Sequence, residues 1–270
     1  VKNTIALGLN SKSSAENATA FGLNAAAAGA DSLAFGTNAA ASVKNTIALG
    51  LNSKSSAENA TAFGLNAAAA GADSLAFGTN AAASVKNTIA LGLNSKSSAE
   101  NATALGLGAN ASAKDTISIG TNAKTSDVNA IALGINSKSL SGNAVAIGLR
   151  SEAAGADSLA FGSAARTSDV NSIALGNQAA ASKANTIALG TQTKAAGANA
   201  IALGNQADAS VFQSIALGTS AKASAADTVA LGTGSIASGN SAIALGNKAQ
   251  ALGSNSISIG KGNIVSGKNS

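Results

Sequence analysis

The side chains that could do chemistry in this sequence are carboxylates, amines and hydroxyls, because the chain contains no histidine and no cysteine. That composition excludes imidazole-activated nucleophiles and zinc sites built on histidine or cysteine. Aspartate and glutamate could still pair as a general acid and base. Five aspartates, however, occupy a recurring place that asparagine fills elsewhere, which favours a role in turns: Asp31, Asp73, Asp115, Asp157 and Asp227. We therefore expect neither an enzyme nor a cofactor.

Two short motifs suggest chemistry but lack the expected context. Gly262 to Lys268 has the spacing GxxxxGK of a phosphate-binding loop, but Asn269 stands where Ser or Thr should follow, and no helix is expected there. Asn17-Ala18-Thr19 fits a glycosylation sequon. We place Thr19 in the core of the fold, and so expect no modification at Asn17.

A repeat of fourteen residues carries all of these side chains. Glycines at 8, 22, 36 and onward to 260 form a series of nineteen, always fourteen residues apart. Such a short fixed period marks a solenoid, in which each repeat is one coil resting on its neighbours. Residues 1–42 and 43–84 are identical. We expect 1–270 to be one continuous domain and a fragment of a longer array.

Within each coil, numbered so that this glycine is position 8, the pattern predicts two strands and two turns. Position 5 is Ile, Val, Leu or Thr, position 6 is Ala or Ser, and position 7 is Leu, Ile or Phe. Apolar residues two apart, with β-branched enrichment, indicate a strand. Small residues at 11 and 13 indicate a second strand, and Asn or Asp at position 3 suits a turn. The prediction is an all-β, single-stranded solenoid of parallel coils with stacked Asn ladders.

The distribution of charge predicts which faces are covered. Every charged residue lies at positions 1, 2, 3, 9, 10 or 12. We expect positions 5 and 7 to fill the coil interior, which leaves position 6 on the opposite face. Exclusion of charge from both faces indicates a sheet covered on both sides, and another copy of the chain is the expected cover. Alternatively, the small residues only favour tight stacking within a coil. The expected interface residues are Ala6, Ala48, Ala90, Ala132, Ala174, Ala188, Ala202, Ala216, Ala230 and Ala244.

The second strand offers the candidate ligand-binding residues. Basic side chains recur at position 12, namely Lys12, Lys54, Lys96, Lys124, Lys138, Arg166, Lys194 and Lys222. They form either a solvated face or a weak basic stripe for anionic glycans or matrix proteins. Phe212 lies in a turn and is either a contact point or folded over the neighbouring coil. The net charge of +5 is spread along the chain, so we expect no nucleic-acid partner. No apolar run is long enough for a membrane helix, and we expect no direct membrane contact.

The repeat Asn-Ser/Thr-Ile-Ala-Leu-Gly, followed by x-x-Ala/Ser-x-Ala/Ser-Ser, resembles the head repeats of trimeric autotransporter adhesins, the YadA-like family of Gram-negative bacteria. The resemblance covers essentially the whole chain. It implies a left-handed parallel β-roll assembled as a homotrimer. It also implies export to the bacterial surface and anchoring in the outer membrane through a C-terminal region absent here. Such heads attach to host extracellular matrix proteins, host cells or neighbouring bacteria.

Three functions follow from these patterns. The expected one is a non-enzymatic adhesin head. The alternative is a passive rigid spacer that projects a separate adhesive tip domain, which the duplicated block of 42 residues favours because duplication changes length more readily than specificity. An ice-binding solenoid would need a regular Thr array, and the only Thr-x-Thr is Thr191-Gln192-Thr193.

Overall fold

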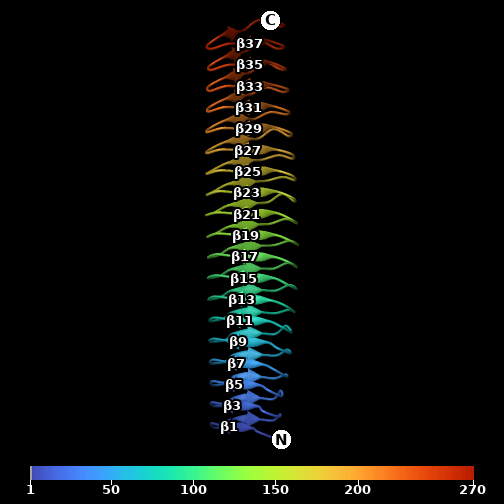
Figure 1. Cartoon of the computed structure of the whole chain (residues 1–270), viewed down its shortest axis with the longest axis vertical. Helices are drawn as coiled ribbons and strands as arrows, with labels where there is room; N and C mark the ends of the chain where they lie inside the picture. Colours follow the sequence, from blue (N-terminus) through green and yellow to red (C-terminus); the bar gives the residue numbers. More distant parts are fainter. Residues whose placement is uncertain (1) are drawn as a thin grey trace. The chain divides into compact units, whose positions relative to one another are not determined.

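The computed structural model describes residues 2–270, and every regular element among them is a β-strand. The chain forms two compact units, Val1–Asn136 (unit 1) and Ser137–Ser270 (unit 2). Residues 2–270 contain no helix that could cross a membrane. Each unit is a stack of coils, as Figure 1 shows, so the predicted parallel β-solenoid with a period of fourteen residues is confirmed.

In both units, odd-numbered strands cover positions 5 to 7 of a coil and even-numbered strands cover positions 12 and 13. The odd strands of unit 1 are β1 (Ile5–Leu7), β3 (Thr19–Phe21), β5 (Leu33–Phe35), β7 (Ile47–Leu49), β9 (Thr61–Phe63), β11 (Leu75–Phe77), β13 (Ile89–Leu91), β15 (Thr103–Leu105), β17 (Ile117–Ile119) and β19 (Ile131–Leu133). Its even strands are β2 (Lys12–Ser13), β4 (Ala26–Ala27), β6 (Ala40–Ala41), β8 (Lys54–Ser55), β10 (Ala68–Ala69), β12 (Ala82–Ala83), β14 (Lys96–Ser97), β16 (Asn110–Ala111) and β18 (Lys124–Thr125).

Unit 2 repeats this arrangement. Its even strands are β20 (Lys138–Ser139), β22 (Glu152–Ala153), β24 (Arg166–Thr167), β26 (Ala180–Ala181), β28 (Lys194–Ala195), β30 (Asp208–Ala209), β32 (Lys222–Ala223), β34 (Ile236–Ala237), β36 (Gln250–Ala251) and β38 (Ile264–Val265). Its odd strands are β21 (Val145–Ile147), β23 (Leu159–Phe161), β25 (Ile173–Leu175), β27 (Ile187–Leu189), β29 (Ile201–Leu203), β31 (Ile215–Leu217), β33 (Val229–Leu231), β35 (Ile243–Leu245) and β37 (Ile257–Ile259).

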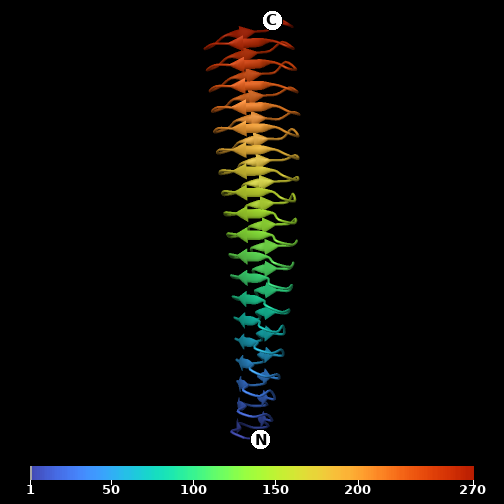
Figure 2. The ribbon, with the colours of Figure 1, turned by 45° about the vertical axis from the view of Figure 1, so that its right-hand side comes forward.

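Strands of the same kind pair in parallel from coil to coil, always offset by one repeat. Ile47 lies beside Thr61 in the odd sheet, and Lys54 lies beside Ala68 in the even sheet. Figure 2 shows the two strands of each coil running in opposite directions. Each unit is therefore two facing parallel sheets, and identical coil positions form ladders along it.

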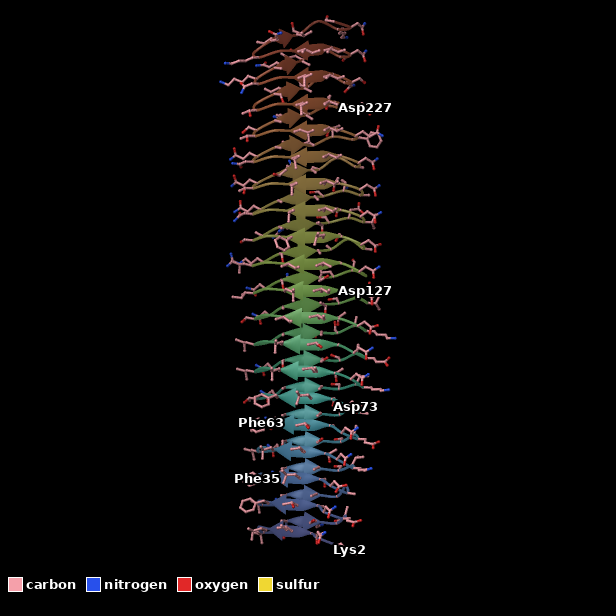
Figure 3. All side chains as sticks on the ribbon, viewed as in Figure 1. Lys2, Phe35, Phe63, Asp73, Asp127 and Asp227 are labelled. Carbon is pink, nitrogen blue, oxygen red and sulfur yellow. The ribbon has the colours of Figure 1, made fainter. Side chains whose placement is uncertain are left out.

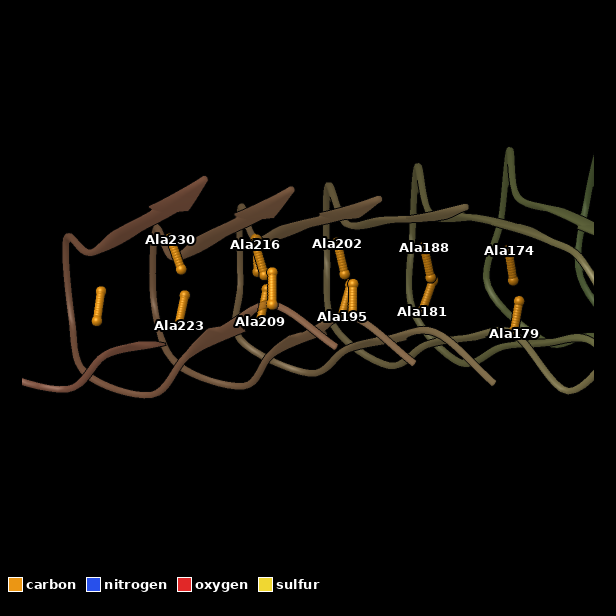
Figure 4. Packing of buried hydrophobic residues seen from close by; sticks show 14 of the residues in the cluster. Ala174, Ala179, Ala181, Ala188, Ala195, Ala202, Ala209, Ala216, Ala223 and Ala230 are labelled. Atoms are coloured by element: carbon orange, nitrogen blue, oxygen red, sulfur yellow. The ribbon is translucent and has the colours of Figure 1, made fainter. Parts of the chain in front are cut away.

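The interior between the two sheets is filled by small side chains. Apart from the first and last coils, positions 4, 6, 11 and 13 are buried throughout, and they hold only Ala, Ser and Thr. Figure 4 shows Ala188 opposite Ala181 and Ala230 opposite Ala223 across this narrow space. The expectation that the large residues at 5 and 7 fill the interior is therefore wrong. The two strands of a coil lie too close together for Leu or Phe, so those side chains project outward.

Buried hydroxyl groups in this interior bond to the backbone, which removes most of the cost of burying them. The Ser55 hydroxyl donates to the Ala60 carbonyl at 2.7 Å, and Thr46 donates to Val43 at 2.6 Å. The same two bonds recur in later copies of these coils. Most Ser and Thr side chains that replace Ala inside the coil are paired in this way, but the hydroxyl groups of Ser32 and Ser74, at position 4, are buried without a hydrogen-bond partner.

Ladders of side-chain amides run along both turn edges of the coils where neighbouring coils carry Asn or Gln there. At position 3, Asn45 donates to Asn59 at 3.0 Å, and Asn59 donates to Asp73 at 2.9 Å. An aspartate ends this run because an ionised carboxylate has no proton to donate. A second ladder at position 10 includes Asn38 and Asn52 at 2.9 Å. The position 3 ladder confirms the prediction, whereas the ladder at position 10 was not predicted. Both positions have φ values of 53 to 59° where they are not glycine, a region that Asn tolerates better than most residues.

The glycine at position 8 is required by its backbone angle and by its neighbour in the next coil. Gly232 has a φ of +130°, and a Cβ added there would lie 2.5 Å from the Gly246 carbonyl oxygen. Gly234, two residues later, has a φ of +64°, and an added Cβ would lie 3.5 Å from the nearest side-chain atom. Ala164 occupies the same coil position as Gly234, with a φ of 55°.

We predict that Gly232→Ala lowers the free energy of unfolding by about 3 kcal/mol, because it adds both backbone strain and a steric clash. Gly234→Ala is the matched control in the same turn, and we expect it to cost about 1–2 kcal/mol, because it adds the strain of a left-handed backbone without a backbone clash. Chemical denaturation of both variants measures the difference. Equal losses of stability would contradict the assigned role of position 8.

The narrow interior leads to a second prediction. Ala188→Leu should overpack the coil and lower the free energy of unfolding by about 1–3 kcal/mol. Ala180→Leu adds the same side chain on the outward side of an even strand, where Ile236 is the native residue at the same position of a later coil, and should be nearly neutral. Thermal unfolding of the two variants compares them, and a tolerated Ala188→Leu would show that position 6 does not face a narrow interior.

Candidate interaction surfaces

The outward side of the odd strands is an apolar face, which we define as positions 5 and 7 of every coil. Its side chains are substantially exposed, with Ile47 at 39 %, Phe35 at 46 % and Leu203 at 39 %. No charged residue occurs at either position. An exposed apolar face that continues from coil to coil marks an interaction surface rather than a solvated one.

Two further features add to the apolar face in unit 1. The rings of Phe21 and Phe35 stack with centroids 4.7 Å apart, and those of Phe63 and Phe77 stack at 4.5 Å. Position 9 also carries exposed apolar residues in unit 1: Leu9, Leu23, Leu51, Leu65, Leu93, Leu107 and Ile135. In most of unit 2, position 9 is Asn, Ser or Thr, so the apolar surface of unit 1 is wider.

The position 6 alanines, which we expected to contact other copies of the chain, do not lie on the apolar face. Ala48, Ala90, Ala132, Ala174, Ala188, Ala202, Ala216, Ala230 and Ala244 have no exposed surface. They point toward the even strand within their own chain, so they have no surface with which to touch another copy. Ala6 is exposed, but it belongs to the first coil. The expected interface residues therefore have to be corrected, because positions 5 and 7, and not 6, face outward.

The basic residues at position 12 lie on the outward side of the even strands, opposite the apolar face. All eight candidates are exposed there: Lys12, Lys54, Lys96, Lys124, Lys138, Arg166, Lys194 and Lys222. Glu152 and Asp208, the acidic residues at this position, are half-buried. Phe212 remains 48 % exposed in its turn, so the neighbouring coil covers its ring only in part.

The acidic residues of unit 1 gather at one edge of the stack, at positions 1 to 3. Figure 3 shows Asp73 and Asp127 on the same edge as Lys2, with Phe35 and Phe63 on the other side. The side chain of Asp73 accepts a hydrogen bond in the amide ladder. These contacts confirm the expected turn role of the position 3 aspartates that end such ladders.

The two short motifs also have defined places. Thr19 lies on the outward side of β3 and is half-buried, so its expected core position is wrong. Asn17 is exposed and donates to Asp31 at 2.8 Å in the amide ladder. Gly262 is followed by the strand β38 rather than by a helix, so the loop from Gly262 to Lys268 lacks the helix of a phosphate site.

Neither unit contains a pocket among residues 2–270. The same residues hold no cluster of three or more side chains suited to bind a metal ion. The surfaces available for recognition are therefore the apolar face, the two turn edges and the outward side of the even strands. We call this last surface the lysine-bearing face, because it carries the basic residues of position 12.

Comparison with known proteins places this repeat in a family. A family model described as "YadA head domain repeat (2 copies)" matches in successive segments from residue 2 to residue 263, some of them overlapping and the others separated by gaps of at most a few residues. No curated protein matches the chain. Among solved structures, the collagen-binding domain of the Yersinia adhesin YadA is similar at 20 % identity with a TM-score of 0.25, covering 70 % of this chain and 82 % of that one. The family model spans nearly all coils, and the chain therefore belongs to the YadA head domain repeat family.

Proposed function

We propose that this chain is the head region of a bacterial surface adhesin, which attaches to host extracellular matrix proteins, host cells or neighbouring bacteria. The main support for this proposal is that the family model matches nearly every coil of the chain. The family is a structural adhesin family rather than an enzyme family. In the proposed setting, the head stands on the cell surface and is anchored in the outer membrane through a C-terminal region.

We propose further that the head is a homotrimer of left-handed β-rolls, joined through the apolar face. Support comes from the exposure of positions 5 and 7 and from the absence of charge there. In water this face would leave large side chains such as Phe35 and Phe77 solvated in a chain whose interior holds only small ones. Packing three such faces together removes them from water, and the number three is what the resemblance implies.

An assembly of identical solenoids suits adhesion because it presents each surface position many times. Individual contacts on a flat surface without pockets are weak, but several contacts made by one assembly act together and raise the avidity. The lysine-bearing face remains outward in the proposed trimer, since it lies opposite the apolar face. It is therefore the surface offered to a partner.

The second candidate function is a passive spacer that projects a separate adhesive tip. The identity of residues 1–42 and 43–84 favours it, because exact duplication lengthens an array without adding a new surface. The two functions differ in whether this chain itself binds.

We predict saturable binding of the purified chain to at least one of immobilised collagen, fibronectin, laminin or cultured cells. Surface plasmon resonance or a plate assay measures it, with an unrelated solenoid as the control. If the longer protein that contains this chain adheres while the chain alone binds none of them, the spacer function replaces the adhesin function.

For the assembly, we predict that wild-type protein sediments as a trimer and that the triple variant Leu175→Glu, Leu189→Glu, Leu203→Glu does not. These substitutions place carboxylates in three successive coils of the apolar face. Each unpaired charge buried at an interface costs several kcal/mol, so the expected result is dissociation or loss of the folded trimer.

The control for this prediction places negative charge on the opposite face. Ala180→Glu, Lys194→Glu and Lys222→Glu together change the net charge by more than the test variant does, but all three residues lie on outward positions of even strands. We expect this variant to remain trimeric in analytical ultracentrifugation. A trimer that survives the three Leu→Glu changes would rule out the apolar face as its interface.

A further inference from the structure

We propose that the outward side of the even strands in unit 1 binds linear polyanionic polysaccharides, chains that carry sulfates or carboxylates. The binding residues are Lys12, Lys54, Lys96 and Lys124, which we call the lysine row. The proposal rests on the proposed surface role and names one class of partner for it. It assigns this partner to four of the exposed basic residues and not to the others.

The lysine row has no acidic partner on its own face. Register places Lys54 between Ala40 and Ala68, and Lys96 between Ala82 and Asn110. Positions 10, 12 and 14, which surround the lysines, hold no Asp or Glu anywhere in unit 1. Among residues 2–270, the ion pairs are those that Lys114 makes with Glu100 and Asp115. Each side chain of the row is therefore exposed, and no carboxylate lies beside it on this face.

The basic residues of unit 2 differ in this respect. Glu152 lies in register between Lys138 and Arg166, and directly opposed opposite charges stabilise neighbouring strands. Similarly, Asp208 lies between Lys194 and Lys222 in successive coils. In each group one carboxylate lies between two basic side chains, so the charge of the group is partly compensated within the protein. We therefore do not assign these groups to an external anion.

The lysines at position 2 of unit 1 are compensated as well. Glu16, Glu58 and Glu100 share that position with Lys2, Lys44, Lys86 and Lys114 and occupy coils next to them. The Lys114 ammonium group lies 3.9 Å from the Glu100 carboxylate. This edge also carries the aspartates of position 3. Unit 1 therefore has two sets of four lysines, one beside acidic residues and one without them.

The geometry of the lysine row fits an extended chain. Lys12, Lys54 and Lys96 are three coils apart, which is roughly 14 Å at the spacing of neighbouring strands. In the coils between these three lysines the same position holds alanine, so a linear polymer meets no larger side chain at that position along this part of the row. Each exposed ion pair is weak, but a polymer that meets several lysines at once gains avidity. Isolated small anions, by contrast, should bind poorly.

Other polyanions fit this surface less well. Single-stranded nucleic acids bind through aromatic side chains on which bases stack, and position 12 holds no aromatic residue in unit 1. A folded acidic protein would need a buried anchor in a pocket for a stable interface, and neither unit contains a pocket among residues 2–270. A polysaccharide with regularly spaced sulfates or carboxylates needs neither feature.

The test measures binding of the full chain to immobilised heparin, which is sulfated, and to immobilised hyaluronan, which carries only carboxylates. We expect wild-type protein to bind at least one of them, with affinity that falls as salt is raised. The variant Lys12→Gln, Lys54→Gln, Lys96→Gln, Lys124→Gln should lose roughly tenfold or more in affinity, because the four contacts act together. Its circular dichroism and thermal unfolding should match the wild type, since all four side chains are exposed.

The matched control replaces the same number of lysines in the same unit and changes the net charge equally: Lys2→Gln, Lys44→Gln, Lys86→Gln, Lys114→Gln. We expect this variant to bind like the wild type. Equal losses in both variants would show that net charge alone governs binding and would overturn the assignment, as would absence of wild-type binding to both polymers. Binding to immobilised collagen, fibronectin and laminin is measured in parallel. If the chain binds one of these proteins but neither polysaccharide, the assignment of the lysine row fails while the adhesin function stands. If it binds none of them, the adhesin function fails as well.

Discussion

The distance between the two strands of each coil is the constraint on which the rest of this structure depends. The interior admits only Ala, Ser and Thr, so every large apolar side chain has to project outward. Gly at position 8 and left-handed residues at positions 3 and 10 make the tight turns that bring the strands this close. The same turns align neighbouring coils so closely that glycine backbones meet directly, as Gly50 meets Gly64.

A narrow interior leaves little hydrophobic stabilisation inside the chain. A buried alanine methyl group contributes about 0.8 kcal/mol, whereas full burial of a Leu, Ile or Phe side chain contributes about 1.5–3 kcal/mol. Each coil holds its two largest apolar residues on the outside, where a single chain leaves them partly in water. Assembly through the apolar face would bury the part of these side chains that a single chain leaves exposed and would add to the hydrophobic stabilisation of the interior. Folding of the chain is in this way linked to association.

Much of the fold could be predicted from the sequence, because the glycine period and the alternation within each coil have direct structural meaning. The two strands, the inward positions 11 and 13, the exposed lysines of position 12 and the Asn ladder at position 3 all appear in the structure. The ladder at position 10 could not be predicted in the same way, because Gln, Ala, Arg and Gly replace Asn at this position in later coils. A residue such as Ala164 gives no signal in the sequence that it adopts a positive φ.

Alternation alone could not predict which side of the odd strands faces the interior, because either set of alternating residues can face inward. A signal was nevertheless present: positions 4, 6, 11 and 13 share one composition of small residues, which indicates that they line a common space. The exclusion of charge from both faces correctly marked a sheet with two apolar sides. The error lay in which side was enclosed by the chain itself, and it moved the proposed interface from Ala188 to Ile187 and Leu189.

The most direct measurement uses single cysteine variants, since the chain has no cysteine of its own. We expect Leu189→Cys, on the apolar face, to form covalent dimers and trimers when treated with a short bifunctional thiol reagent. Ala188→Cys, one residue away and enclosed within its own coil, should react slowly and should not link chains. Efficient crosslinking of the Ala188→Cys variant would contradict the claim that the large side chains face sister copies. So would a folded Leu189→Cys protein whose thiol reacts freely but never joins two chains.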